Sequence, residues 1–317
     1  MLSEKLARVK AANIALKDSL SHCMICPRKC GVDRTKGKAG YCKAKEKCVV
    51  YSYSSHQGEE PPISGSRGSG TIFFTHCNMR CVYCQNYSFS QLGSGQETST
   101  DKLSRMMLHL EKTGCHNINL VTPTHFVPQI LLALEKALED GLKIPIVYNT
   151  SGYELPETIK LLEGIVDIYL PDMRYSDNSM AKKYSDAPGY ADTNRSSIKV
   201  MQEQVGDLVM DEAGIAKRGM IIRLLALPGG ISGTEDSLKF ISKDISKSAY
   251  LSIMSQYYPA YKSLEYKELS SGITSDEYAN IVDAAHEMGL NNGWVQETPG
   301  KTDEKFLGTN IKPRTEI

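Results

Sequence analysis

The sequence lacks the features of a secreted or membrane-spanning protein. No apolar run approaches the ~18 residues that a transmembrane helix needs. The N-terminal stretch MLSEKLARVKAANIALKDSL mixes charged and apolar side chains, without the apolar core and cleavage site of a signal peptide. Net charge is lacking too: Lys plus Arg and Asp plus Glu both number 37, so no overall field would hold a nucleic acid or an anionic membrane. We expect a cytoplasmic protein that binds neither.

Cysteine, in contrast, is abundant, with nine residues. Structural disulfides are rare in a reducing cytoplasm, so cysteines there indicate metal binding or catalysis. Eight of the nine lie between Cys23 and Cys84, and only Cys115 lies outside this stretch. Such clustering indicates metal ligands, whereas buried core thiols would be scattered along the chain.

Short β-rich runs alternate with helical patterns after residue 70, which is typical of βα units around a parallel sheet. Helix boundaries are marked as well. Pro128 opens an apolar helical run that stops at Gly141, and Thr274 with Glu277 forms a capping box. Six strands are predicted, at Thr71–Thr75, Asn117–Thr122, Ile144–Asn149, Val166–Leu170, Met220–Leu227 and Ala249–Met254.

Six such strands predict an α/β fold, either an open doubly wound sheet or an incomplete barrel, and periodicity does not choose between them. In both folds ligands bind at the carboxyl ends of the strands. The first strand runs directly into His76 and Cys77, which places a cysteine loop at that edge. Residues 1–65 have a different composition, rich in Lys, Cys and Gly. We interpret them as an N-terminal Cys-rich appendage and linker, followed by a main domain of residues 66–317.

The loop THCNMRCVYCQN spaces the thiols of Cys77, Cys81 and Cys84 as C-x3-C-x2-C. Cysteine thiolates are the usual ligands of a [4Fe–4S] cluster, and three of them leave the fourth iron open. The amino and carboxylate groups of S-adenosylmethionine (SAM) fit such an open position. One electron then cleaves a carbon–sulfur bond and releases a 5′-deoxyadenosyl radical, which abstracts hydrogen from a substrate. The alternatives are a zinc site or core thiols, but structural zinc prefers four ligands grouped as pairs.

At these residues the sequence resembles the radical SAM superfamily, over roughly residues 20–290. Within it the chain looks most like the pyruvate formate-lyase activating enzyme-related group. The resemblance implies a partial (β/α)6 barrel of TIM type with the N-terminal Cys-rich appendage. It is carried by the segments CMICPRKCGV, GSGTIFFTHCNMRCVYCQN, NINLVTPTHFVPQI, IPIVYNTSGYE, VDIYLPD and the strand end from Arg223 to Pro228.

The resemblance also implies SAM contacts at successive strand ends. The turn with Thr124 and His125 matches the turn that contacts the SAM amino group, although the activating enzymes usually have Gly-Gly-Glu there. Asn149, Ser151 and Gly152 match a turn beside the nucleoside, where a glycine lets the backbone approach closely. The plainer alternatives are that Asn149, Ser151 and Gly152 form only a polar turn, and that His125 is only a capped loop histidine.

Two further strand ends carry charged candidates. Asp172 and Arg174 match an Asp-x-Lys element near the ribose and the methionyl carboxylate, and Arg for Lys changes the hydrogen-bond geometry. Arg223 is expected to point at SAM or substrate. For Asp172 the alternative is a helix cap. The sequence identifies no residue that performs the hydrogen abstraction itself.

A second group of four thiols lies in the appendage, at Cys23, Cys26, Cys30 and Cys42. Four cysteines are enough to close a metal site. A zinc ion would cross-link and stabilise a segment that is too small to bury its own core. An auxiliary [4Fe–4S] cluster would instead relay electrons to the first cluster. Spacing leaves both open, with the cluster slightly favoured. Cys48 could replace one of the four, although a buried thiol is the better interpretation.

Two functions follow. The first is a radical SAM oxidoreductase that receives electrons from a flavodoxin or ferredoxin and acts on a protein, peptide or small molecule. Installing a glycyl radical on a partner enzyme is one version of it. The second is a non-catalytic iron–sulfur electron-transfer protein or a zinc-binding protein. It predicts closed metal sites and no use for the polar strand ends.

Overall fold

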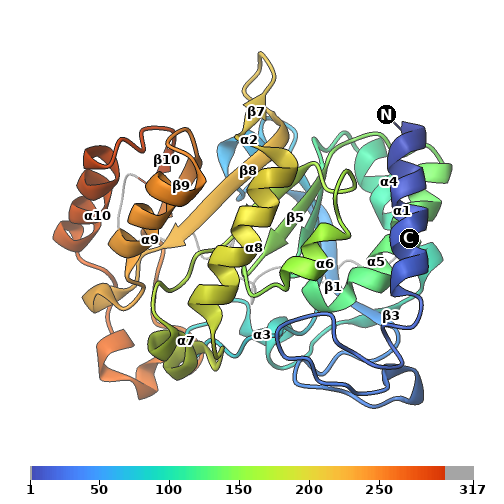
Figure 1. Ribbon diagram of the computed structural model, residues 1–317, viewed down its shortest axis with the longest axis horizontal. Helices are drawn as coiled ribbons and strands as arrows, with labels where there is room; N and C mark the ends of the chain where they lie inside the picture. Colours follow the sequence, from blue (N-terminus) through green and yellow to red (C-terminus); the bar gives the residue numbers. More distant parts are fainter. Residues whose placement is uncertain (1, 297–317) are drawn as a thin grey trace.

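The computed structural model describes residues 2–296, which form one mixed sheet covered by helices (Figure 1). The strand order is β10-β9-β8-β6-β5-β4-β2-β1-β3, and β7 pairs with β8 outside this path. Neighbours from β10 to β2 are parallel, whereas β1 is antiparallel to both β2 and β3. Within the described residues the edge strands β10 and β3 do not pair, so the sheet is open. The predicted α/β fold with a partial barrel is confirmed.

All six predicted strands are present, as β2, β4, β5, β6, β8 and β9. The prediction missed β1, which comes from the stretch assigned to the appendage, and the short strands β3, β7 and β10. The bounds are β1 Cys48–His56, β2 Ser69–Phe74, β3 Gln96–Thr98, β4 Ile118–Val121, β5 Ile146–Thr150, β6 Ile168–Pro171, β7 Val209–Met210, β8 Ala216–Leu225, β9 Tyr250–Met254 and β10 Gly293–Val295.

The two helices whose sequence signals were described, α5 and α10, begin at or next to those signals. Pro128 lies in the first turn of α5, and Thr274 and Glu277 form the capping box of α10. The bounds are α1 Leu2–Leu16, α2 Pro61–Ser64, α3 Tyr87–Ser90, α4 Thr100–Lys112, α5 Val127–Glu139, α6 Pro156–Lys160, α7 Asn178–Ser185, α8 Tyr190–Val205, α9 Thr234–Phe240 and α10 Ser275–Glu287.

Alternate strand residues face opposite sides of the sheet. On β5, Ile146 and Tyr148 pack under the helices in the main core, whereas Val147 faces the inside of the curved sheet. There it joins a small apolar cluster that includes Ile63 of α2. Ile63 is fully buried, so α2 plugs the amino-terminal end of the barrel. The candidate functional site lies at the opposite end, where the parallel strands finish.

The N-terminal part of the chain divides in two. Helix α1 packs beside α5, where the Asn13 side-chain amide donates to Glu135 Oε2 at 2.6 Å. Residues 17–47, called here the Cys-rich segment, form irregular loops at the same end of the sheet as α3 and α7 (Figure 1). The division at residue 65 stays a prediction, and β1 is a part of residues 1–65 that belongs to the sheet.

Candidate functional site

The first candidate site is the loop of residues 76–86, called here the cysteine loop, which follows β2. His76 turns the chain out of the strand with a left-handed φ of 72°. Two backbone hydrogen bonds then fasten the loop to the end of α7. The Arg80 N–H donates to the Ser185 carbonyl at 2.8 Å, and the Val82 N–H donates to the Tyr184 carbonyl at 2.9 Å.

The three cysteines of this loop are buried or partly buried. Cys77 and Cys81 are 8% and 6% exposed, and none of the nine cysteines forms a disulfide. Burial, and then the neighbouring Cys81 and Cys84, raise the pKa of Cys77 to about 12. The metal-free Cys77 thiol would therefore stay protonated at neutral pH, and binding to a cationic centre is what makes it a thiolate.

The thiols of Cys77, Cys81 and Cys84 influence one another within the cysteine loop. Cys81 and Cys84 contribute to the raised pKa of Cys77, and Cys81 contributes to the raised pKa of Cys84. In a [4Fe–4S] cluster each thiolate binds a different iron. Among residues 2–296, no group of three or more His, Cys, Asp or Glu side chains is arranged to hold a single metal ion.

A cavity of about 150 Å³ opens beside Cys84 at the carboxyl ends of β6, β8 and β9. Its wall joins the cysteine loop to three of the predicted residues, which come from strands distant in sequence. The lining residues are Tyr83, Cys84, Gln85, Asn86, Asp172, Arg174, Arg223, Leu225, Met254 and Gln256.

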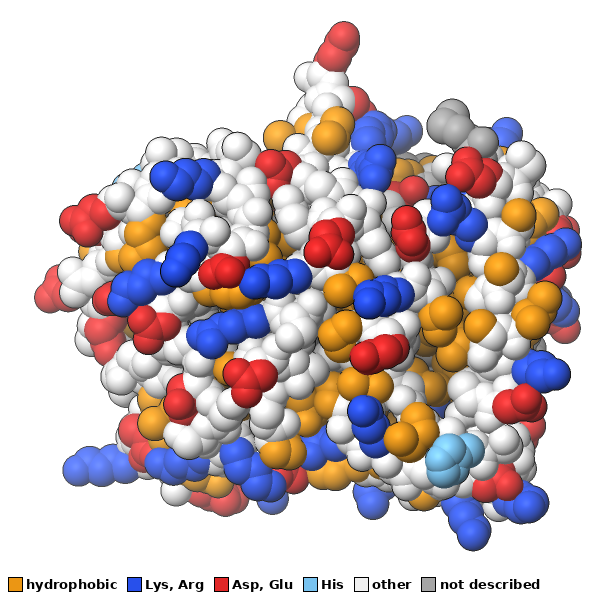
Figure 2. All heavy atoms as spheres, in the orientation of Figure 1, with side chains coloured by type: hydrophobic (Ala, Val, Ile, Leu, Met, Phe, Trp, Pro, Cys, Tyr) orange, Lys and Arg blue, Asp and Glu red, His pale blue; other side chains and the backbone are white. Residues whose placement is uncertain are grey.

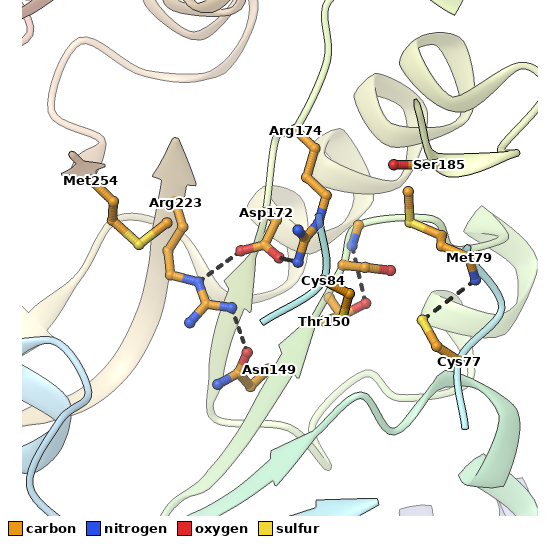
Figure 3. Close-up of polar contacts among 12 residues, drawn as sticks. Cys77, Met79, Cys84, Asn149, Thr150, Asp172, Arg174, Ser185, Arg223 and Met254 are labelled. Atoms are coloured by element: carbon orange, nitrogen blue, oxygen red, sulfur yellow. Dashed lines mark hydrogen bonds and ion pairs between the residues drawn. The ribbon is translucent and has the colours of Figure 1, made fainter. Parts of the chain in front are cut away.

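Charged side chains line one wall of this cavity (Figure 3). The Arg223 guanidinium donates to Asp172 Oδ1 at 2.8 Å and to Asn149 Oδ1 at 2.7 Å. Arg174 pairs with the same carboxylate. The Arg174 Nε atom is buried and has no hydrogen-bond partner among the described residues. Four predicted residues thus meet at one place and leave one donor for an anionic ligand group.

The turn after β5 is built for close packing. Gly152 has a φ of +74°, and a Cβ there would lie 2.3 Å from the Asp172 carbonyl oxygen. Ser151 is buried, and its hydroxyl has no partner among the described residues. Its carbonyl accepts a hydrogen bond from Tyr190 at 2.8 Å. Glycine is therefore required at this strand end, and the Ser151 hydroxyl is free for a ligand.

The turn after β4 does not line the cavity. His125 lies 2.8 Å from the Thr75 carbonyl through Nε2, which must be the protonated nitrogen, and Nδ1 has no partner among the described residues. Burial lowers the pKa of His125 to about 3, so the ring is neutral. The Thr124 hydroxyl donates to Glu154 Oε1 at 2.5 Å. Neither Thr124 nor His125 lines the cavity, so SAM contact by these two residues stays a prediction.

Three acidic residues of this region were missed by the sequence reasoning. Glu59 and Glu60 precede α2 and approach Arg223 to 3.7 and 4.0 Å from the plugged end. Glu154 is fully buried behind the strand-end turns, and burial raises its pKa to about 7. A Glu-Glu pair before Pro-Pro looks like a solvated linker. The one available signal was its position directly before an apolar turn.

The second group of thiols is also brought together. Burial raises the pKa of Cys26 to about 12, and the charges of Cys42 and Cys23 contribute. Gly40 packs directly on Cys30, since a Cβ there would lie 2.7 Å from its Sγ atom. Cys48 and Cys115 are each 2% exposed, as expected for core thiols.

The Cys-rich segment packs directly on the cysteine loop. Arg28 Nε donates to the Asn78 carbonyl at 2.9 Å, and Arg80 Nη2 donates to the Tyr41 carbonyl at 2.6 Å. The Arg28 guanidinium also lies 3.5 Å above the centre of the Tyr41 ring. The segment that carries the second group of thiols is therefore in direct contact with the loop that carries the first.

Comparison with known proteins gives one family. The sequence model of the radical SAM superfamily matches residues 71–202. An uncharacterized protein of Methanocaldococcus jannaschii is 29% identical over 285 residues, which cover 86% of this chain and 77% of that protein.

Several solved structures are similar to this chain over part of their length. Streptococcus suis SuiB bound to precursor peptide SuiA has a TM-score of 0.49 and 12% identity, over 70% of this chain and 47% of that one. A radical SAM methyltransferase from Sphaerobacter thermophilus has a TM-score of 0.47 and 13% identity, over 71% of this chain and 65% of that one. This chain thus spans less than two thirds of either structure. None of the helices between residues 2 and 296 has the length and apolar character to cross a membrane.

The matched residues 71–202 contain the cysteine loop, the turns after β4 and β5, and Asp172 with Arg174. They are thus the part of the chain in which the structure brings the thiols and the polar strand ends together. Over these residues the chain is similar to the radical SAM superfamily.

Proposed function

We propose that the protein is an enzyme that reductively cleaves SAM and uses the resulting radical to abstract hydrogen from a substrate. The observation that carries this proposal is the position of the cysteine loop, with Cys77, Cys81 and Cys84, beside a cavity walled by Asp172, Arg174 and Arg223. When bound to Cys77, Cys81 and Cys84, a [4Fe–4S] cluster supplies the electron that cleaves the carbon–sulfur bond of SAM.

The residues of the chain bind and orient SAM. The unpartnered Arg174 Nε is suited to the methionyl carboxylate, and Asp172 accepts hydrogen bonds from ribose hydroxyls. The free Ser151 hydroxyl and the Gly152 backbone face the nucleoside. Arg223 acts through Asp172 and Asn149, because both of its short hydrogen bonds go to these side chains.

Tyr83 limits access of water to the cysteine loop. It is 2% exposed, and its hydroxyl donates to that of Tyr175 at 2.7 Å. Its ring also packs edge-on against Tyr257, with ring centres 5.9 Å apart. An aromatic wall of this kind keeps solvent away from a reactive radical.

The four thiols of Cys23, Cys26, Cys30 and Cys42 are proposed to hold an auxiliary [4Fe–4S] cluster, with zinc as the alternative. Support comes from the proximity of these thiols, because Cys23 and Cys42 contribute to the raised pKa of Cys26, and Cys23 and Cys30 to that of Cys42. Iron and acid-labile sulfide per chain decide between the two metals. The wild type should hold about twice the iron of a Cys26→Ala/Cys30→Ala variant if both sites carry the same cluster.

The partners are proposed in the same way. A flavodoxin or ferredoxin would supply electrons, in the cytoplasm, and the substrate would be a protein, a peptide or a small molecule. Relation to the pyruvate formate-lyase activating enzymes, and with it glycyl-radical installation, belongs to this proposal. The competing function, a non-catalytic iron–sulfur or zinc protein, leaves the unpartnered Arg174 and Ser151 donors without a role.

The test is SAM cleavage by anaerobically reconstituted protein reduced with dithionite. We expect 5′-deoxyadenosine and an altered cluster EPR signal on adding SAM. Cys81→Ala should abolish both, whereas Cys115→Ala, which removes a buried thiol far from the loop, should keep both. Absence of 5′-deoxyadenosine from iron-replete wild-type protein would refute the proposed function.

A further inference from the structure

The charge of the chain is unevenly distributed. The chain as a whole has 37 basic and 37 acidic residues, yet residues 27–47 hold eight basic and only two acidic ones. The remainder is therefore net acidic by the same margin. The basic residues are Arg28, Lys29, Arg34, Lys36, Lys38, Lys43, Lys45 and Lys47.

The lysines of this segment face outward. All six are exposed, whereas Arg34 is buried and Arg28 is half-buried against the cysteine loop. Lys36 and Lys47 pair with Asp33 and Glu97. The remaining four, Lys29, Lys38, Lys43 and Lys45, make no ion pair within residues 2–296. Figure 2 shows basic side chains projecting at the lower right, where Figure 1 places the Cys-rich segment.

This lysine surface, defined as Lys29, Lys38, Lys43 and Lys45, is carried by the same segment as the second group of thiols. Lys29 and Lys43 each directly neighbour one of its cysteines. Both lysines have left-handed φ values, 41° and 67°, so each side chain is carried on a tight turn. The segment contacts the cysteine loop through Arg28 and Tyr41.

We propose that the lysine surface is the docking site of an acidic one-electron donor protein, of the flavodoxin or ferredoxin class. This inference rests on the proposed function, which needs one electron for each SAM cleaved. In the docking event the donor is oxidised by one electron and the enzyme is reduced by one, and no atom is transferred. Unpaired lysines on a net-neutral chain attract an acidic partner and orient it on the segment that carries these thiols.

Other anionic partners have weaker support. A nucleic acid or an anionic membrane would also be attracted to lysines, but neither needs to approach a buried group of thiols. The four lysines flank Cys30 and Cys42 in the sequence. The segment that carries them accepts a hydrogen bond from Arg80 of the cysteine loop. That position favours a partner that exchanges electrons.

The experiment compares two charge reversals in the reconstituted full chain. Lys38→Glu/Lys43→Glu changes the lysine surface. Lys243→Glu/Lys247→Glu is the matched control, because these two exposed lysines lie away from the Cys-rich segment and also make no ion pair within the described residues. Affinity for an acidic flavodoxin is measured by calorimetry at low and at moderate salt, and SAM cleavage is driven in parallel by reduced flavodoxin and by dithionite.

We expect the first variant to bind flavodoxin about tenfold or more weakly and to lose the salt dependence of binding. Its flavodoxin-driven cleavage should fall by a similar factor, whereas dithionite-driven cleavage and the control variant stay unchanged. Equal binding by both variants would overturn the inference, and so would an equal loss with dithionite. Binding of phosphatidylserine vesicles or duplex RNA in place of flavodoxin would overturn it too. Failure of the wild type with dithionite would instead refute the proposed function.

Discussion

Replacing Arg223 with Met tests whether this cation neutralises the buried carboxylates inside the barrel. Arg223 is the counter-charge of Asp172 at 2.8 Å, and of Glu59 and Glu60 at 3.7 and 4.0 Å. All three carboxylates are less than a tenth exposed. Removing the cation from such a group leaves buried charge without a partner, at a cost of about 3–5 kcal/mol in the free energy of unfolding.

The cost of Arg223→Met should depend on pH. Burial raises the pKa of Glu59 and of Glu60, and Arg223 opposes this shift in the wild type. Without Arg223 both pKa values rise further, so the folded variant binds protons that the unfolded chain releases above its ordinary Glu pKa of about 4.3. Its stability therefore falls as pH rises. We expect the loss to be clearly larger at pH 8 than at pH 5.

The assay is urea unfolding of metal-free protein followed by circular dichroism at both pH values. Arg223→Met/Glu60→Gln should recover part of the loss, because it removes one unpaired charge and keeps the side-chain shape. Arg218→Met, on the same strand but exposed, should cost no more than about 1 kcal/mol. A loss of equal size at pH 5 and pH 8, or no recovery in the double variant, would refute this reasoning.

Three further predictions concern the thiols and Glu154. Cys81→Ala should remove the iron of the cysteine loop, whereas Cys115→Ala should leave iron content unchanged, as measured by metal analysis. Glu154 has a pKa of about 7 in the folded state, so wild-type stability should fall from about pH 4.5 to 7, and Glu154→Gln should flatten this slope in unfolding curves; an unchanged slope would contradict the pKa. Gly40→Ala should lower iron bound by the Cys-rich segment, because its Cβ would lie 2.7 Å from Cys30 Sγ, and full retention of iron would show that the packing relaxes.

The strands and the cysteine loop were predictable because their signals are local. TIFFT is a continuous β-rich run, and the cysteine spacing directly after it is visible without any tertiary information. Asn149, Asp172 and Arg223 could be grouped as well, since the carboxyl ends of parallel strands share one edge. The structure confirms that these three side chains meet.

The parts that were missed depend on contacts between distant residues. Strand β1 is antiparallel to β2 and lies in a stretch whose composition resembles the appendage. Glu59 and Glu60 become part of the interior only because α2 enters the barrel and meets Arg223 on a much later strand. Glu154 is buried and accepts hydrogen bonds from the Thr124 and Thr150 hydroxyls. The spacing of these residues in the sequence does not predict this contact.

Helix α2 blocks the amino-terminal end of the curved sheet. Ile63 is fully buried there among inward-facing side chains. The cavity beside Cys84 lies at the opposite end, where the strands finish. A ligand of this cavity is therefore expected to approach from the side of the cysteine loop, so substitutions on that loop should change how fast the ligand binds and leaves.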